Sequence, residues 1–161
     1  MIGLVLHEGE YVTYPYEVLK PVEEYVKTLN WRITNVVCGS DGSDYFFPFE
    51  QQEDSLLDGE TLLVMLQEHP RKQWVWGAMS GFQKDVSWDE IRKNPIEDLT
   101  LRQPYLENTL HHLEPGAVLE VIAFDSSATF VMTDDPDVAD RFLAAFPKAE
   151  SLDKYVFETE K

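Results

Sequence analysis

The 161-residue sequence contains one cysteine, Cys38, so the chain has no internal disulfide. A chain without disulfides suits a reducing compartment. No apolar run approaches the roughly 18 residues that a membrane-spanning helix needs. The apolar run at the start, residues 1–6, is too short for a signal peptide. These absences predict a soluble protein of the cytoplasm.

Basic residues are missing from two long segments, 33–70 and 103–140. Each segment contains eight acidic residues and no Lys or Arg, while the other 85 residues hold 14 acids and 13 bases. The two segments therefore supply −16 of the formal net charge of −17. A field of one sign repels nucleic acid and anionic membranes and attracts cationic partners. We expect a basic protein as the partner, and neither nucleic acid nor membrane.

Motifs of common enzyme classes are also missing from the sequence. There is no Gly-x-Ser-x-Gly elbow and no Gly-rich phosphate-binding fingerprint. Paired Cys, His-Glu-x-x-His and calcium-loop motifs are absent as well, so no cofactor is expected. Cys38 has no His beside it in the sequence, and we interpret it as a packing residue.

The stretch His111-His112-x-Glu114 is the one candidate for a set of metal ligands. Adjacent side chains on a helix point about 100° apart, so two neighbouring histidines rarely chelate one ion unless the backbone is irregular. Ordinary surface or half-buried histidines are the simpler interpretation. The alternative is a small metal-dependent hydrolase that uses His111, His112 and Glu114 with an acid from the second acidic segment.

Hydrophobic periodicity predicts a mixture of strands and helices without a regular βαβ repeat. Strands are expected at residues 2–7, 31–38, 45–49, 73–79, 117–125, 128–133 and 155–157. Helices are expected at residues 17–29 with a break at Pro21, at 59–68, at 88–94, at 105–113 and at 136–146. Helix N-caps are expected at Asp58, at Ser87 and at Asp134 or Asp135. This pattern predicts a single α+β domain over residues 1–161, with an antiparallel or mixed sheet packed by helices on one face.

Four aromatic residues lie close together in the first acidic segment, in Tyr45-Phe46-Phe47-Pro48-Phe49. Successive side chains of an extended strand point to opposite faces, so the four rings cannot all enter one core. Either the segment is buried on both sides, or some rings line an acidic surface. Rings surrounded by carboxylates would suit a basic protein surface, through contact area and cation–π contacts. Trp74, Trp76 and Trp88 leave the same two interpretations open, and we expect at least one Trp or Tyr of this set to be exposed.

One part of the chain resembles known proteins. Residues 120–127, Glu-Val-Ile-Ala-Phe-Asp-Ser-Ser, are followed by a second strand, a capped helix and Phe146-Pro147. This pattern, over residues 117–157, resembles the ending of small, acidic, largely uncharacterised bacterial proteins, some of which are immunity proteins that block a toxin by covering it. The resemblance implies a binding role and brings no catalytic residues.

We therefore expect a non-enzymatic acidic protein that occludes a basic partner, of the immunity or inhibitor kind. The predicted contact residues are acids and rings of the first acidic segment together with one tryptophan: Asp41, Asp44, Tyr45, Phe47, Glu50, Glu53, Asp54 and Trp76. Besides the hydrolase, one further alternative stays open. The acidity could serve solubility alone, in a structural or regulatory subunit with apolar partner contacts.

Overall fold

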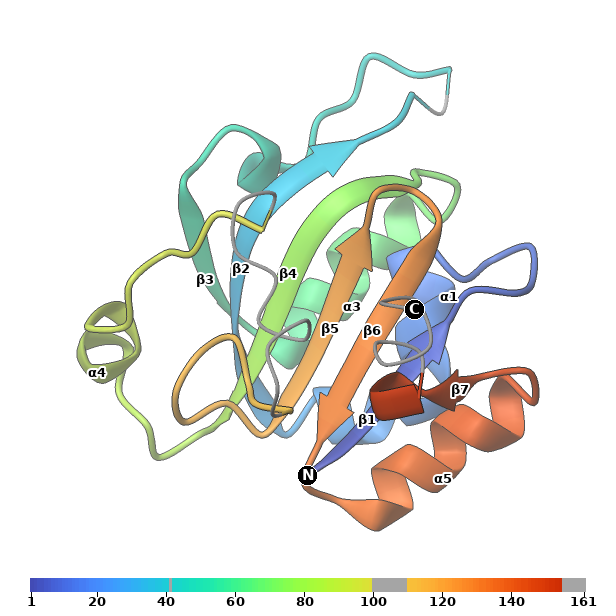
Figure 1. Ribbon diagram of the computed structural model, residues 1–161. Coiled ribbons are helices and arrows are strands. Elements are labelled where there is room, and N and C mark those ends of the chain that lie inside the picture. The colour runs from blue at the N-terminus through green and yellow to red at the C-terminus, as the bar shows by residue number, and fades with distance from the viewer. Residues whose placement is uncertain (41, 100–109, 155–161) are drawn as a thin grey trace.

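A computed structural model of the chain describes residues 1–40, 42–99 and 110–154. Seven strands form one antiparallel sheet in the order β3-β2-β4-β5-β6-β1-β7 (Figure 1). The strands are β1 (Ile2–Leu6), β2 (Leu29–Cys38), β3 (Asp54–Asp58), β4 (Trp74–Gln83), β5 (Leu119–Phe124), β6 (Ala128–Thr133) and β7 (Glu150–Ser151). The ten-residue strands β2 and β4 pair with each other and lie toward one edge of the sheet.

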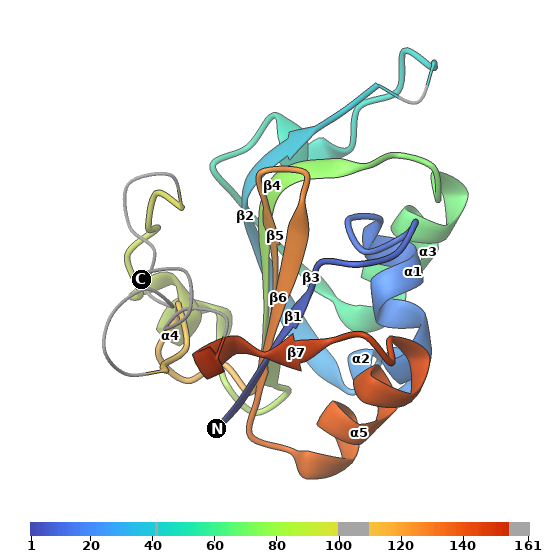
Figure 2. The ribbon, with the colours of Figure 1, turned by 45° about the vertical axis from the view of Figure 1, so that its right-hand side comes forward.

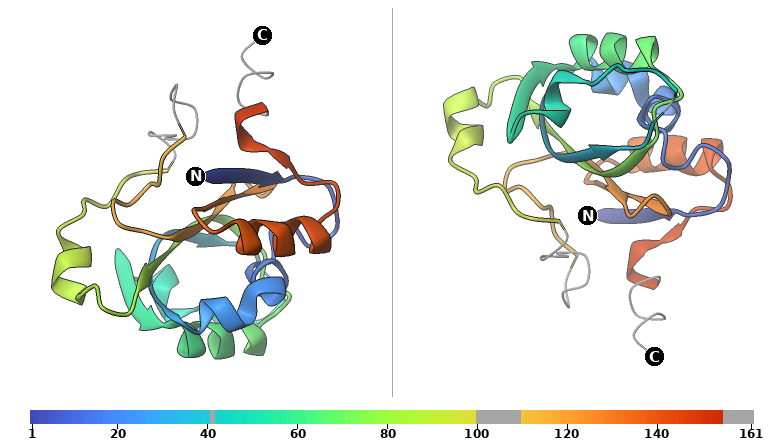
Figure 3. Two further views of the ribbon diagram at one scale, coloured as in Figure 1. Left: turned by 90° about the horizontal axis from the view of Figure 1, so that it is seen from below. Right: turned by 90° about the horizontal axis from the view of Figure 1, so that it is seen from above.

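Helices cover one face of this sheet, as the edge-on view in Figure 2 shows. They are α1 (Pro15–Leu19), the 3₁₀ turn η1 (Lys20–Val22), α2 (Glu23–Val26), α3 (Gly59–Glu68) and α5 (Pro136–Ala145). The short α4 (Trp88–Arg92) lies apart from them at the side of the molecule (Figure 3). This arrangement confirms the predicted α+β class and the sheet packed by helices. Within the described residues, no helix is both long and apolar enough to cross a membrane.

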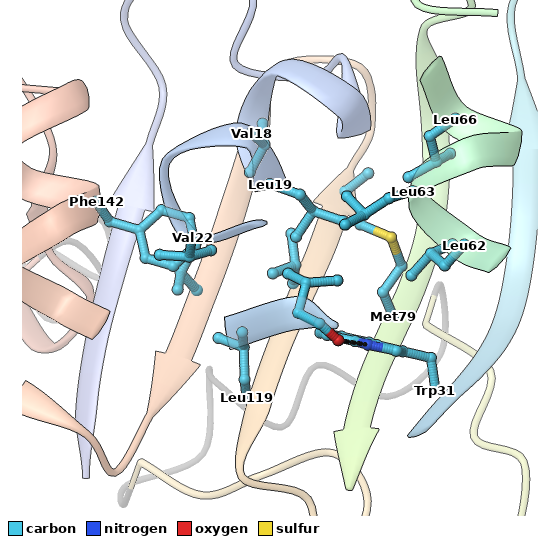
Figure 4. Close-up of a cluster of buried hydrophobic side chains, with 14 of the residues drawn as sticks. Val18, Leu19, Val22, Trp31, Leu62, Leu63, Leu66, Met79, Leu119 and Phe142 are labelled. Carbon is cyan, nitrogen blue, oxygen red and sulfur yellow. Dashed lines mark hydrogen bonds between the residues drawn. The ribbon is translucent and has the colours of Figure 1, made fainter. Parts of the chain in front are cut away.

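The main core fills the space between the sheet and these helices. Figure 4 shows Phe142 beside Val22 at one side of this core and Leu62 beside Met79 at the other, where Trp31 also lies. The Trp31 indole donates from Nε1 to the carbonyl of Val26 at 3.1 Å, which satisfies the one polar atom of a fully buried ring. The tryptophan thus holds α2 close to the sheet.

The opposite face of the sheet is also largely covered. Side chains alternate along each strand, so the neighbours of the main-core residues form a second cluster there, which includes Ala78, Ile122 and Phe130. The long connections between β4 and β5 supply Leu99 and Leu113 to this cluster. Coverage on both faces explains why β4, β5 and β6 are apolar at nearly every position.

Most local predictions are confirmed at the residues that carry them. Asp58 caps α3 by accepting from the Thr61 amide at 2.8 Å. Ser87 caps α4 in the same way, and Asp135, one of the two residues considered, caps α5. The predicted helix 17–29 is broken at Pro21, where the 3₁₀ turn η1 separates α1 from α2.

Two predictions need correction. The return strand predicted at 45–49 is wrong, because Pro48 begins the 3₁₀ turn η2 (Pro48–Glu50) and β3 pairs with β2 instead. The helix predicted at 105–113 does not extend over residues 110–113, which have no regular structure. Residues 105–109 of that helix, and the strand predicted at 155–157, lie outside the described residues.

Candidate functional site

The aromatic segment of the first acidic stretch folds around Lys72, a buried lysine with 4% of its surface exposed. The Lys72 ammonium lies 2.9 Å from Glu50 Oε2 and donates to the carbonyl of Tyr45. It also lies 4.8 to 5.7 Å from three ring centroids, those of Tyr45, Phe46 and Phe47. A cation over aromatic faces is attracted by the ring electrons. One buried charge therefore organises this segment from within the chain.

This packing decides which of the predicted contact residues can meet a partner. Phe47 is 1% exposed and stacks on Phe49 at 4.8 Å between centroids, so it belongs to the core. Glu50 is bound to Lys72 and accepts from the Phe47 amide, so its carboxylate is also committed internally. Tyr45 is half-buried and stacks on the His69 ring at 3.6 Å. Of the four rings, Phe46 is the exposed one, at 60%.

Of the other predicted contact acids, one is hydrogen-bonded within the fold and two are exposed. Asp54 is half-buried and bonded to Arg32, with 3.2 Å between Oδ2 and Nε. Asp44 and Glu53 are exposed. Asp41 lies outside the described residues. Residues 39–40 and 42–47, which follow β2, belong to a segment that projects beyond the sheet (Figures 1 and 2).

A thiol lies at the base of this projecting segment. Cys38, at the end of β2, is half-buried. Burial, together with the nearby Glu50 carboxylate, raises the pKa of the Cys38 thiol far above its usual range. The residue is accordingly a neutral thiol at physiological pH and a poor nucleophile, in agreement with its interpretation as a packing residue.

A pocket of about 520 Å³ opens beside Trp76, between the ends of β2 and β4 and two connecting segments. Its apolar lining includes Val37, which is 53% exposed, and the half-buried Trp76. The Trp76 ring is held by an edge-on contact with Phe124, with 5.0 Å between centroids. The described lining residues include three acids and no Lys or Arg: Asn35, Val36, Val37, Gln52, Glu53, Trp76, Ile96, Glu97, Asp98 and Leu99.

Asn35 fixes one wall of this pocket. The pairing of β2 with β4 is irregular between Thr34 and Val37, and Asn35 there has φ of 60°, in the left-handed region that asparagine tolerates better than most residues. Its side-chain amide donates to the Glu97 carbonyl at 2.8 Å and accepts from the Leu99 amide at 3.3 Å. The wall at residues 97–99 is thus hydrogen-bonded to the sheet.

Two of the three residues considered as metal ligands, His112 and Glu114, belong to a buried network centred on Glu120. The Glu120 carboxylate accepts from the Ser80 hydroxyl at 2.8 Å and from the amides of Leu113 and Glu114 at 2.7 and 3.1 Å. Its Oε1 also lies 2.9 Å from His112 Nδ1. The network holds the segment before β5 against the sheet.

Ionisation in this network follows from burial and charge. Burial lowers the pKa of His112, but the carboxylates of Glu120 and Asp134 outweigh this effect and raise the pKa above its usual value. Burial raises the pKa of Glu114, although Arg32 opposes that change from 2.7 Å. Among residues 1–40, 42–99 and 110–154, no three His, Cys, Asp or Glu side chains are grouped so that they could hold a metal ion. Nothing in the described geometry therefore favours the hydrolase alternative.

Sequence reasoning identified Trp76 and Glu53 but missed their neighbours in the pocket. Ile96, Glu97 and Asp98 follow Pro95 in a segment without clear periodicity, so nothing local placed them beside β2. The buried network around Glu120 was easier to predict from the sequence. Arg32 and Ser80 are paired in register, and so are Ser80 and Glu120, which puts all three polar residues on one face of adjacent apolar strands.

Comparison with known proteins adds no relative: no protein-family model, no curated protein and no solved structure matches this chain.

Proposed function

We propose that this protein is a non-enzymatic binding protein that covers a cationic surface of a protein partner, of the immunity or inhibitor kind. The observation that carries the proposal is the open pocket in which Trp76 lies among Glu53, Glu97 and Asp98. Aromatic side chains supply contact area at protein interfaces, and carboxylates select a basic partner and speed its approach.

The contact surface extends from this pocket to the neighbouring projecting segment. Glu53 and Asp44 are exposed acids, and Phe46 is an exposed ring. The two structural acids Glu50 and Asp54 and the buried Phe47 support this surface from beneath and do not contact the partner. The surface is thus smaller than the sequence suggested and has Trp76 and Phe46 as its rings.

Occlusion is the mechanism that fits such a surface. Unlike charges accelerate the encounter, mainly through the association rate and mainly at low salt, and the aromatic contacts then slow dissociation. The formal charge of −17 also favours a basic partner, since it repels acidic proteins and nucleic acids.

Two charge-reversed variants test the proposal. Asp44→Lys combined with Glu53→Lys changes two exposed acids of the proposed surface, and Glu68→Lys combined with Asp140→Lys changes two exposed acids on α3 and α5. Each protein is immobilised and exposed to native lysate at low salt and at about 1 M salt, where charges are screened beyond about 3 Å.

A basic protein should bind the wild-type chain and the α3/α5 variant at low salt and should be released at high salt. It should not bind the Asp44/Glu53 variant, whose unfolding midpoint should match that of wild type. Equal capture by both variants, or capture that salt does not weaken, would contradict the proposal.

A further inference from the structure

The pocket beside Trp76 has the chemistry of a receptor for a planar cation. One wall is an indole ring, which attracts cations over its face more strongly than the other aromatic side chains. Negative charge comes from the lining acids Glu53, Glu97 and Asp98. Val37 and Ile96 add apolar surface to the same lining. A cation on an aliphatic stem could use each of these parts at once.

The pocket is also formed before any ligand enters. Asn35 ties the 97–99 wall to β2 through two hydrogen bonds, and Phe124 supports the Trp76 ring from the side. Both of the Asn35 amide groups are occupied by the chain itself, so this residue positions the wall and does not bind the ligand. A preformed site binds more tightly because less ordering accompanies binding.

The size and shape favour arginine over other cations. A volume of about 520 Å³ lies within the range of pockets that take a small molecule or a long side chain. The guanidinium group is planar, stacks on aromatic faces and has five N–H donors, which can reach more than one carboxylate. Lysine offers a compact ammonium that is more strongly hydrated and does not stack. A metal ion is disfavoured because the described residues contain no metal-ligand group.

We infer that this pocket takes an arginine side chain of the protein partner, with the guanidinium against the Trp76 ring and its donors directed to the exposed Glu53 carboxylate. The inference rests on the proposed function, because it is the partner's basic surface that supplies the arginine. It adds a single anchoring residue at the centre of that surface and predicts that the partner's arginine is not replaceable by lysine.

Nuclear magnetic resonance can test this directly in the ¹⁵N-labelled full chain, with peptides as probes. Acetyl-Gly-Arg-Gly-amide is titrated while the indole N–H signal of Trp76, assigned through Trp76→Phe, is followed. The matched control peptide contains citrulline, which has nearly the same shape and no charge. A third peptide contains lysine.

The arginine peptide should shift the Trp76 signal saturably, and the citrulline peptide should bind at least about tenfold more weakly, since charge and cation–π attraction are lost. Lysine should fall between them. Glu53→Gln should weaken the arginine peptide about threefold, whereas Asp140→Asn, on α5, should leave it unchanged. Both substitutions are at exposed positions and should leave the fold intact.

Several results would overturn the inference. These are an absent Trp76 shift, equal binding of arginine and citrulline peptides, or free arginine amide binding more tightly than the peptide, which would indicate a small-molecule site. Such results leave the proposed function standing if the Asp44/Glu53 variant still loses the basic partner. If that variant retains the partner while the arginine peptide binds at Trp76, the proposed function is wrong, but arginine binding in the pocket is supported.

Discussion

Arg32 and Glu114 form an ion pair of 2.7 Å between Nη1 and Oε1, with only 3% and 4% of their side chains exposed. The pair connects β2 with the segment before β5, which lies 82 residues further along the chain. Arg32 also donates to the carbonyls of Ile91, in α4, and of Asn94, just after that helix. One guanidinium therefore joins three separate parts of the chain.

Replacing Arg32 alone should strongly destabilise the protein. Arg32→Met leaves the Glu114 carboxylate buried without its cation, and breaking such a pair costs about 3–5 kcal/mol of the free energy of unfolding. Urea unfolding measures this loss. The double variant Arg32→Met/Glu114→Leu should recover part of it, because the buried Glu114 carboxylate is removed, although the half-buried Asp54 still lacks Arg32. A double variant as unstable as the single one would contradict this explanation.

His112 should make stability depend on pH. Its pKa is raised in the folded state by Glu120 and Asp134, so protonated His112 stabilises the fold. This contribution is complete below the unfolded value of about 6.5 and is lost as the pH rises through the higher folded pKa. The difference in free energy of unfolding between wild type and His112→Asn should therefore shrink as the pH rises above 6.5. A constant difference between pH 5 and pH 9 would show that the charge on His112 is irrelevant.

Cys38 should react slowly with thiol reagents in the native protein. Because its pKa lies far above the usual value, the thiolate fraction at pH 8 is more than about tenfold lower than in the unfolded chain. Labelling with a disulfide reagent, followed by absorbance, compares native protein with protein in guanidinium chloride. Equal rates in the two conditions would show that Cys38 is accessible and ionised.

The Asp58 cap should contribute about 1 kcal/mol to stability, the usual value for an N-cap replaced by alanine. Asp58→Asn keeps a side-chain acceptor for the Thr61 amide and serves as the matched control. That amide also lowers the pKa of Asp58, so the advantage of wild type over Asp58→Ala is present above the unfolded value and declines as the pH falls through the lower folded pKa. Thermal unfolding of the three proteins between pH 2 and pH 7 checks this, and an alanine variant as stable as wild type at pH 7 would disprove it.

Local signals accounted for most of the fold. The cap at Asp58 and the break at Pro21 follow from interactions within a few residues, and the structure has both of them. The pairing of β3 with β2 could not be read in this way. The sequence Asp54–Asp58 is short and has acids at both ends, whereas the aromatic run before it looked more like a strand.

The candidate site was less predictable for a physical reason. The aromatic segment depends on Lys72, which lies outside the first acidic segment and 27 residues beyond Tyr45. From the sequence alone, Lys72 would be expected at the surface, because buried lysines are rare. Only the tertiary structure shows that this charge is drawn inward and that Phe46 is the ring left exposed.

The sheet order has a consequence for contacts between copies of the chain. The edge strand β3 carries Asp54 and Asp58 at its two ends. If two copies joined these edges in antiparallel register about Leu56, each Asp54 would face the other copy's Asp58. Like charges directly opposite each other destabilise such a pair, and the other edge, β7, pairs through only two residues. The sheet is therefore protected against growing from one molecule into the next, as exposed strands otherwise tend to do.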